Sequence, residues 1–227
     1  MHKATLSREF RELLRKRRGG RDHVVDAVTP KQTALLVIDM QKAFVAPGAV
    51  LEVPAARGIV SNINHLATEM RAAGAVVVWV RCAFAETGRS NWAVYFEQFF
   101  GEDAERVRSA MYPGNDGYAF WPELKMRESD LVVDKDRFSA FIEGACELEH
   151  LLKERGIDTV VITGTVTNVC CESTARDAMM RDFRCIMIED ANAARSDAEH
   201  VAGLMTVARV FGDVMTTHEF LSRHGGM

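Results

Sequence analysis

One stretch decides the fold: Thr159-Val160-Val161-Ile162-Thr163-Gly164-Thr165-Val166-Thr167-Asn168-Val169-Cys170-Cys171-Glu172-Ser173-Thr174-Ala175-Arg176-Asp177. It opens with a β-branched apolar run, which is typical of a buried strand in a parallel sheet. Gly164 and the Thr and Asn residues end that run, and a helical pattern follows. The sequence therefore predicts a strand that turns directly into a helix, with a cysteine at the turn.

A thiol at such a turn has a chemical consequence. Backbone N–H groups at the start of a helix point outward unpaired, and the helix dipole favours an anion there. A cysteine in that position is expected to ionise more easily than a free one. Our working hypothesis is that the turn holds a catalytic thiolate.

Length and composition restrict the class of protein. The 227 residues, 48% of them hydrophobic, suit one large α/β domain or two small ones. A net charge of −4 gives no reason to expect nucleic acid or an anionic membrane as partner. The apolar runs are too short to span a bilayer, and no secretory signal is visible. The five cysteines include no CxxC pair, so we expect reduced thiols and a cytoplasmic location.

The chain divides into an expected N-terminal extension, residues 1–30, and one α/β domain, residues 31–227. Phe10, Leu13 and Leu14 fit a short amphipathic helix in the extension. The basic run at residues 15–18 is interpreted as solvated charge, with an anion-binding arm or an arm packed on a neighbouring subunit as alternatives.

Apolar runs alternate with helical patterns along the domain. This alternation predicts a Rossmann-like three-layer α/β fold, with a parallel sheet covered by helices on both faces. The expected strands are residues 34–38, 75–80, 131–133, 159–163, 185–188 and 214–215. The irregular segment 83–128 contains an aromatic stripe that fits a core, a subunit interface or the roof of a site.

Three reactive residues directly follow predicted strands: Asp39, Lys135 and Cys170. The carboxyl ends of parallel strands share one edge, where ligands bind. A carboxylate can take the thiol proton and pass it to a leaving nitrogen, while an ammonium stabilises the thiolate. Backbone N–H groups at the turn would bind the oxyanion. Together these groups predict acyl transfer to water through a thioester.

Each residue also has a structural interpretation. Asp39 can be a cap, Lys135 solvated loop charge, and a cysteine a small buried hydrophobe. Cys171 shares an apolar helical stripe with Ala175 and Ala178, so Cys170 is the better nucleophile candidate. The remaining thiols, Cys82, Cys146 and Cys185, are interpreted as packing residues.

Three motifs in order resemble the signatures of the isochorismatase-like cysteine hydrolases: Leu36-Val37-Ile38-Asp39-Met40-Gln41, Lys135-Asp136-Arg137-Phe138-Ser139-Ala140-Phe141, and Gly164 to Ala178. The resemblance implies a Rossmann-like fold with a six-stranded parallel sheet. It also implies an Asp–Lys–Cys triad at Asp39, Lys135 and Cys170. In that family a cis peptide shapes the oxyanion hole, here expected at Val166–Thr167, with N–H groups around Val166, Thr167 and Cys170 as donors.

Subfamily differences narrow the expected chemistry. Isochorismatases proper lack the nucleophilic cysteine, so Cys170 favours hydrolysis of a C–N bond over a vinyl ether. Nicotinamidases carry an Asp/His metal cluster after the second strand, whereas residues 81–86 here contain no His. We therefore expect no metal and no other cofactor. The Thr-Asn-Val-Cys-x-Glu-Ser-Thr segment most resembles that of ureidoacrylate and N-carbamoylsarcosine amidohydrolases.

Four further residues are candidate substrate ligands. Arg195 follows the fifth strand and could clamp a carboxylate, although an ion pair with Asp190 or Asp197 fits equally well. Arg137 is a weaker candidate, because it can pack beside the lysine loop. Gln41 and Phe44 follow Asp39 and could line the pocket.

The resulting hypothesis is a metal-independent cysteine amidohydrolase that cleaves a small amide or ureido C–N bond. The resemblance implies a homodimer or homotetramer. An ester or vinyl-ether hydrolase on the same fold is the first alternative. A non-catalytic redox or binding protein that uses the adjacent Cys170 and Cys171 thiols is a distant second, because adjacent cysteines form strained disulfides.

Overall fold

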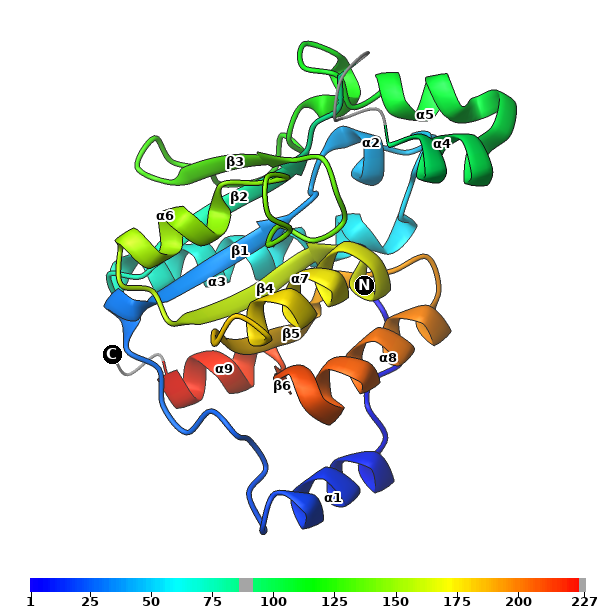
Figure 1. Cartoon of the computed structure of the whole chain (residues 1–227). Coiled ribbons are helices and arrows are strands. Elements are labelled where there is room, and N and C mark those ends of the chain that lie inside the picture. Colours follow the sequence, from blue (N-terminus) through cyan, green and yellow to red (C-terminus); the bar gives the residue numbers. More distant parts are fainter. Residues whose placement is uncertain (86–91, 225–227) are drawn as a thin grey trace.

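A single parallel sheet runs through the molecule (Figure 1). The computed structural model describes residues 1–85 and 92–224. The strands follow the order β3-β2-β1-β4-β5-β6, and every neighbouring pair is parallel. Their bounds are β1 (Thr33–Ile38), β2 (Val76–Cys82), β3 (Leu131–Lys135), β4 (Thr159–Thr165), β5 (Arg184–Ala193) and β6 (Asp213–Met215). The predicted six-stranded α/β fold is confirmed.

Helices cover both faces of the sheet (Figure 1). Because successive strand residues point to opposite faces, Leu35 and Val37 enter a core with residues of α3 and α9, whereas Leu36 enters a second core with α6, α7 and α8. The helices are α1 (Arg8–Arg17), α2 (Lys42–Val45), α3 (Val60–Ala72), α4 (Ala93–Phe100), α5 (Ala104–Ser109), α6 (Leu148–Glu154), α7 (Glu172–Met179), α8 (Asp197–Thr206) and α9 (Thr217–His224). A π-helical turn, η5 (Thr167–Cys171), precedes α7.

The strand order creates one topological switch point. The chain builds outward from β1 to β3 and then returns to the other side of β1 with β4. Beyond the carboxyl ends of β1 and β4, the connections leave in opposite directions and open a crevice. Asp39 follows β1 and Cys170 follows β4, so the topology places these two residues on either side of that crevice.

Residues 1–30 pack on the same chain. Leu6, Phe10 and Leu14 are buried in the core that contains α6, α7 and α8, which confirms the amphipathic helix, whereas Leu13, expected on its apolar face, is exposed. Residues 15–17 of the basic run are exposed, as expected for solvated charge. Arg18 differs, because its guanidinium is largely buried and lies 2.9 Å from the Asp213 carboxylate in β6.

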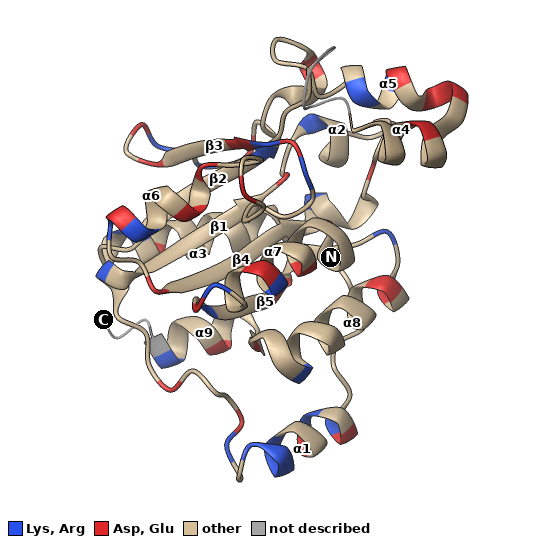
Figure 2. Cartoon of the chain, in the orientation of Figure 1, with Lys and Arg blue, Asp and Glu red and all other residues tan. Residues whose placement is uncertain are grey.

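Charged residues occur mainly in the helices and loops around the sheet (Figure 2). The strands β1 and β4 are buried along their whole length and carry no Lys, Arg, Asp or Glu. Within residues 1–85 and 92–224, none of the helices combines the length and the apolar character needed to cross a membrane.

Candidate active site

A buried ion pair connects two strand ends. Lys135, the last residue of β3, donates from Nζ to Asp39 Oδ2 at 2.8 Å, and both side chains are fully buried. Asp39 adopts a left-handed backbone conformation with φ of 52°. Its N–H donates to Val80 O at 2.8 Å, and its carbonyl accepts from Thr165 Oγ1 at 2.9 Å. The backbone of Asp39 is therefore anchored to both β2 and β4.

The same ammonium contacts a thiol that sequence reasoning assigned to packing. Lys135 Nζ lies 3.1 Å from Cys82 Sγ and 3.1 Å from the carbonyl oxygen of Arg137. Because a lysine ammonium has three N–H donors, Asp39, Cys82 and this carbonyl account for all of them. Cys82 packs in the core as expected, but β2 lies beside β3, which also brings its last residue to the lysine. Cys82, like Asp39, lies at the carboxyl end of a strand of the parallel sheet.

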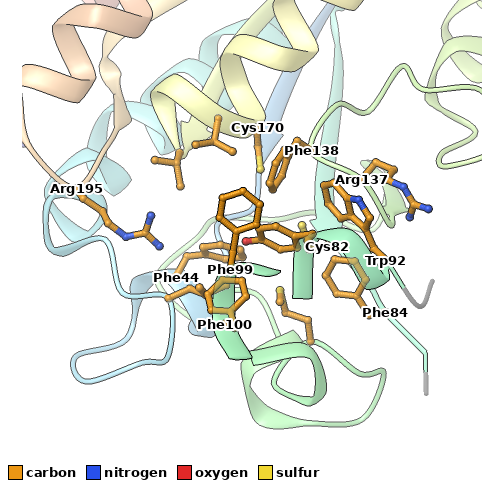
Figure 3. Close-up of a pocket in the computed structure, with 15 residues that line it drawn as sticks. Phe44, Cys82, Phe84, Trp92, Phe99, Phe100, Arg137, Phe138, Cys170 and Arg195 are labelled. Carbon is orange, nitrogen blue, oxygen red and sulfur yellow. The ribbon is translucent and has the colours of Figure 1, made fainter. Parts of the chain in front are cut away.

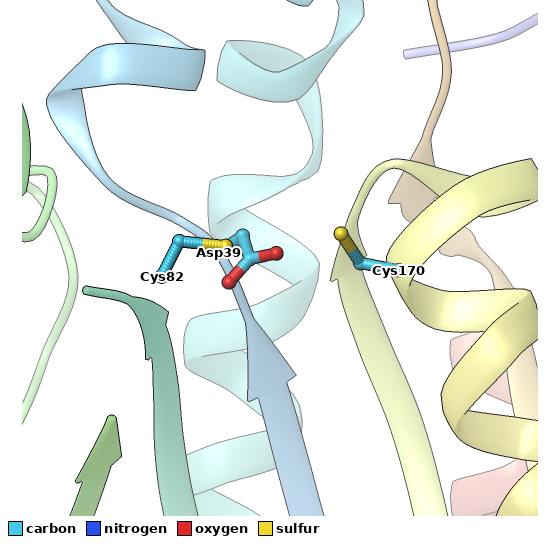
Figure 4. Close-up of side chains that lie close together, drawn as sticks. All are labelled: Asp39, Cys82 and Cys170. Carbon is cyan, nitrogen blue, oxygen red and sulfur yellow. The ribbon is translucent and has the colours of Figure 1, made fainter. Parts of the chain in front are cut away.

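Cys170 completes the cluster from the turn after β4 (Figure 4). A carboxylate oxygen of Asp39 and the sulfur atoms of Cys82 and Cys170 all lie within 4.8 Å of one another. Cys170 is 3% exposed and lines a pocket. Cys171 is fully buried, and its sulfur lies 3.9 Å from the carbonyl oxygen of Thr163 in the core. The structure thus separates the two adjacent thiols.

Electrostatics keep the thiol protonated in the free site. A hydrogen bond with Cys82, burial, and the Asp39 carboxylate raise the pKa of Cys170 well above its ordinary value, and Lys135 opposes them. Burial alone would lower the pKa of Lys135, but Asp39, Cys170 and Cys82 together raise it. The expectation of an easily ionised thiol is therefore wrong, because the hydrogen bond with Cys82, burial and the Asp39 carboxylate raise the pKa of Cys170.

Asp39 has an oxygen available to receive a proton. Its Oδ1 is buried, and no residue in the described part of the chain hydrogen-bonds to it. Most buried acceptors in native proteins are satisfied, so an unsatisfied one calls for an explanation. A general base that takes a proton from a neighbouring thiol would use such an oxygen.

The turn that carries Cys170 is held from two sides. Val166 O accepts from the N–H groups of Val169 and Cys171 at 3.0 and 3.2 Å. Thr167 Oγ1 lies 2.8 Å from Nδ1 of His200, a buried residue of α8. Sequence reasoning did not select His200, because a lone histidine on a helix gives no indication of which turn it will meet.

The cis peptide occurs one bond earlier than expected. It joins Thr165 to Val166, not Val166 to Thr167. Thr165 is still paired with Ala193 in the sheet, so the chain leaves the ladder at the next bond, where the turn begins.

A pocket of about 380 Å³ opens over Cys170 (Figure 3). Three of the four predicted substrate ligands line it: Phe44, Arg137 and Arg195. Gln41 lies elsewhere, fully buried, with its carboxamide bonded to backbone groups of Cys82 and Tyr118.

The two arginines differ in their partners (Figure 3). Arg137 lies 3.2 Å from the carboxylate of Asp136 and stacks over the ring of Trp92. The carboxylates considered as partners for Arg195 are engaged elsewhere. Asp190 accepts from the backbone and hydroxyl of Thr217, and Asp197 pairs with His2. No described residue forms a hydrogen bond or ion pair with Arg195, whose side chain extends into the pocket (Figure 3).

The three clustered groups, Asp39, Cys82 and Cys170, offer potential ligands for a thiophilic metal ion. The ammonium of Lys135 already contacts two of them, and its positive charge would oppose a cation. The absence of a metal stays a prediction, and Glu86, the last residue of the stretch considered for metal ligands, lies outside the described residues.

Comparisons with known proteins agree with this architecture. The family model of the isochorismatase domain matches residues 33–219. The ureidoacrylate amidohydrolase RutB of Klebsiella pneumoniae is 32% identical over 205 residues, which cover 84% of this chain and 86% of that protein. Crystal structures of a cysteine hydrolase from Pseudomonas syringae pv. phaseolicola and of N-carbamoylsarcosine amidase from Thermoplasma acidophilum superpose with TM-scores of 0.76 and 0.68. They share 31% and 29% identity, and cover 86% and 83% of this chain and 93% and 98% of their own.

Proposed function

We propose, from the premise that this chain belongs to the isochorismatase family of hydrolases, that it cleaves a C–N bond of a small amide or ureido compound through a thioester to Cys170. Two of the relatives are named as amidohydrolases of carbamoyl or ureido compounds. The cluster of Asp39, Lys135 and Cys170 supplies the groups that such a reaction requires.

The first step is acylation of the thiol. Cys170 loses its proton to Asp39 as its sulfur attacks the carbonyl carbon of the substrate. Because Cys82, burial and Asp39 raise the pKa of Cys170, proton transfer accompanies attack. Lys135, whose three donors are occupied, acts on the developing thiolate through space by its charge.

The second step releases the amine. The tetrahedral intermediate collapses, the C–N bond breaks, and protonated Asp39 gives its proton to the leaving nitrogen. Water then attacks the thioester and passes a proton to Asp39. The C–S bond breaks, and the proton returns to Cys170. The cycle restores the starting thiol and carboxylate.

Other residues serve as binding groups in this proposal. Backbone N–H groups around Val166, Thr167 and Cys170 hold the oxyanion, where one donor is typically worth ~10²–10³ in rate. Arg195 binds a carboxylate of the substrate, supported by its lack of a partner in the described chain. Phe44 contributes to the apolar wall, and Arg137 to the rim.

One observation carries the proposal: the unpaired Oδ1 of Asp39, buried in a cluster whose carboxylate lies within 4.8 Å of the Cys170 sulfur. Ammonia release from a panel of carbamoyl amino acids and primary amides tests it. Cys170→Ala should abolish release and keep the circular dichroism of the wild type. Cys171→Ala is the matched control and should keep substantial activity. Full activity in Cys170→Ala would disprove the nucleophile assignment.

A further inference from the structure

The walls of the pocket over Cys170 are aromatic. Besides Phe44 of α2, six aromatic residues line it, namely Phe84, Trp92, Tyr95, Phe99, Phe100 and Phe138. They come from separate parts of the chain: Phe84 follows β2, Phe138 follows β3, and the others lie in or beside α4. The described residues of the segment 83–128, which the sequence left open as core, interface or roof, therefore contribute to this pocket.

These rings form a contiguous surface. The ring centroids of Trp92 and Phe138 are 4.6 Å apart, and those of Tyr95 and Phe138 are 5.0 Å apart, both edge to face. Tyr95 also packs edge to face against Phe100 at 5.1 Å. Aromatic pairs at these distances hold each other in fixed orientations. The surface is consequently preformed for a flat apolar group.

Polar groups in the described lining are few. It contains no carboxylate and no carboxamide, and Tyr95 carries its only hydroxyl. The charged groups are Arg137 and Arg195, which lie on opposite sides of the pocket (Figure 3). A small polar ureido acid would leave most of these rings against water, whereas an aromatic ring would bury them.

The size of the cavity leads to the same conclusion. Its volume of about 380 Å³ corresponds to roughly a dozen water molecules at ~30 Å³ each. That space exceeds what a carbamoyl group on a two- or three-carbon acid needs. It accommodates a benzene-sized ring together with the reacting carbonyl at Cys170.

We infer that the substrate is an aromatic carboxylic acid that bears the amide or ureido group, with its ring against Trp92, Tyr95 and Phe138 and its carboxylate at Arg195. This inference rests on the proposed function. It assigns the chemical class of the substrate, which the relatives' names do not give.

The test compares two substrates that share the carboxylate and the ureido group. N-carbamoylphenylalanine should show a kcat/KM about ten- to a hundredfold above that of N-carbamoyl-β-alanine, because only the first buries a ring. Equal values, or a preference for the smaller compound, would overturn the inference and leave the amidohydrolase proposal standing.

A binding experiment separates the two proposals. Calorimetry of the wild-type protein with 3-phenylpropanoate and with propanoate needs no turnover, and the aromatic acid should bind at least about tenfold more tightly. Tight aromatic binding without ammonia release from any substrate would overturn the proposed function and support the aromatic pocket. Equal binding of the two acids would overturn the pocket assignment.

Two exposed residues of α4 provide matched variants. Phe99 is 74% exposed and lines the pocket, whereas Val94 is 61% exposed and does not. Phe99→Ala should lower the ratio of kcat/KM between aromatic and small substrates several-fold, and Val94→Ala should leave it unchanged. An unchanged ratio in Phe99→Ala would contradict a role for the aromatic wall.

Discussion

Lys135 donates to Cys82 at 3.1 Å, so the ammonium of the cluster is held by a thiol as well as by a carboxylate. The second acceptor matters because a lysine side chain has many rotamers and little intrinsic rigidity. With Asp39 on one side and Cys82 on the other, Nζ is fixed beside the nucleophile. Cys82 is therefore expected to act as a positioning residue.

Removing the sulfur should loosen that arrangement. Cys82→Ala leaves one donor of the buried ammonium unsatisfied, and a hydrogen bond to a charged group is worth about 1.5–3 kcal/mol. We expect kcat to fall by about tenfold or more. Cys82→Ser retains an acceptor and should recover part of the loss. Steady-state kinetics of both variants over a range of pH check this; equal kcat values and pH profiles for Ala and wild type would refute it.

Because Asp39 and Lys135 form a buried ion pair, we expect substitutions at the two positions to have non-additive effects on the free energy of unfolding. Removing one partner leaves a buried charge uncompensated, which costs about 3–5 kcal/mol. Lys135→Met and Asp39→Asn should each lower the free energy of unfolding by about this amount. The double variant removes both charges and should be less destabilised than the sum of the single variants.

Urea denaturation of the two single variants and the double variant measures this coupling. All three should also be inactive, because each lacks the base or the ammonium. Simple additivity of the two stability changes would mean that the pair is not coupled, contrary to the 2.8 Å contact.

Gly164 lets β4 approach β1 directly below the site. Its φ is 112°, and a Cβ there would lie 2.1 Å from Ile38 O, which is backbone and cannot move aside. Gly164→Ala should therefore destabilise the fold by more than about 3 kcal/mol, since overpacking adds to the left-handed strain.

Gly48 is the control for this substitution. It also has a positive φ, of 74°, but a Cβ added there would meet no other atom within 4 Å. Thermal unfolding of Gly48→Ala should show only the cost of placing an L-residue in the left-handed conformation, which is about 1–2 kcal/mol in the free energy of unfolding. Similar melting temperatures for the two variants would argue against the steric explanation.

His200 should make stability depend on pH. Burial, with a smaller effect of His2, lowers its pKa from 6.5 to about 4. Between those values the unfolded chain binds a proton that the folded chain does not, so acidification favours unfolding. The contribution of neutral His200 to the free energy of unfolding is complete above pH 6.5. As the pH falls toward 4, this contribution is lost at up to about 1.4 kcal/mol per pH unit.

A substitution isolates this residue from other titrating groups. In His200→Asn the amide can still reach Thr167, but the group no longer titrates. Urea denaturation at pH 7.5 and at pH 5 should therefore give a smaller loss of stability for the variant than for the wild type. Equal losses would assign the acid sensitivity to groups other than His200.

The sequence was sufficient for the parts of the fold that depend on local pattern. Apolar strand runs located all six strands, and the strand-end argument brought Asp39, Lys135 and Cys170 to one edge. The rule was applied too narrowly, because Cys82 also ends a strand. Contacts such as that of Thr167 with His200 join residues 33 positions apart. Their geometry depends on how α8 packs, which periodicity does not specify.

The protonation of Cys170 was a second property that the sequence did not predict correctly. A helix start favours a thiolate, but the burial of this sulfur and its distance from Asp39 depend on tertiary packing. Likewise, the aromatic stripe of α4 was recognisable in the sequence, whereas the cavity it faces requires Phe138 and Phe84 from other strand ends.

Gln41 behaves as a surrogate peptide group. Its Oε1 accepts from Cys82 N at 2.8 Å and its Nε2 donates to Cys82 O at 2.9 Å. It thereby gives the end of β2 the rung of hydrogen bonds that a neighbouring strand would supply, although β1 has already ended at Ile38. The short segment after β1 thus contributes Asp39, the proposed acid–base group, and Gln41. Gln41 holds the backbone of Cys82, whose thiol contacts Lys135. Asp39 and Gln41 therefore belong to one structural unit, and a substitution at Gln41 would alter the charge network through the backbone of Cys82, with Asp39, Lys135 and Cys170 themselves unchanged.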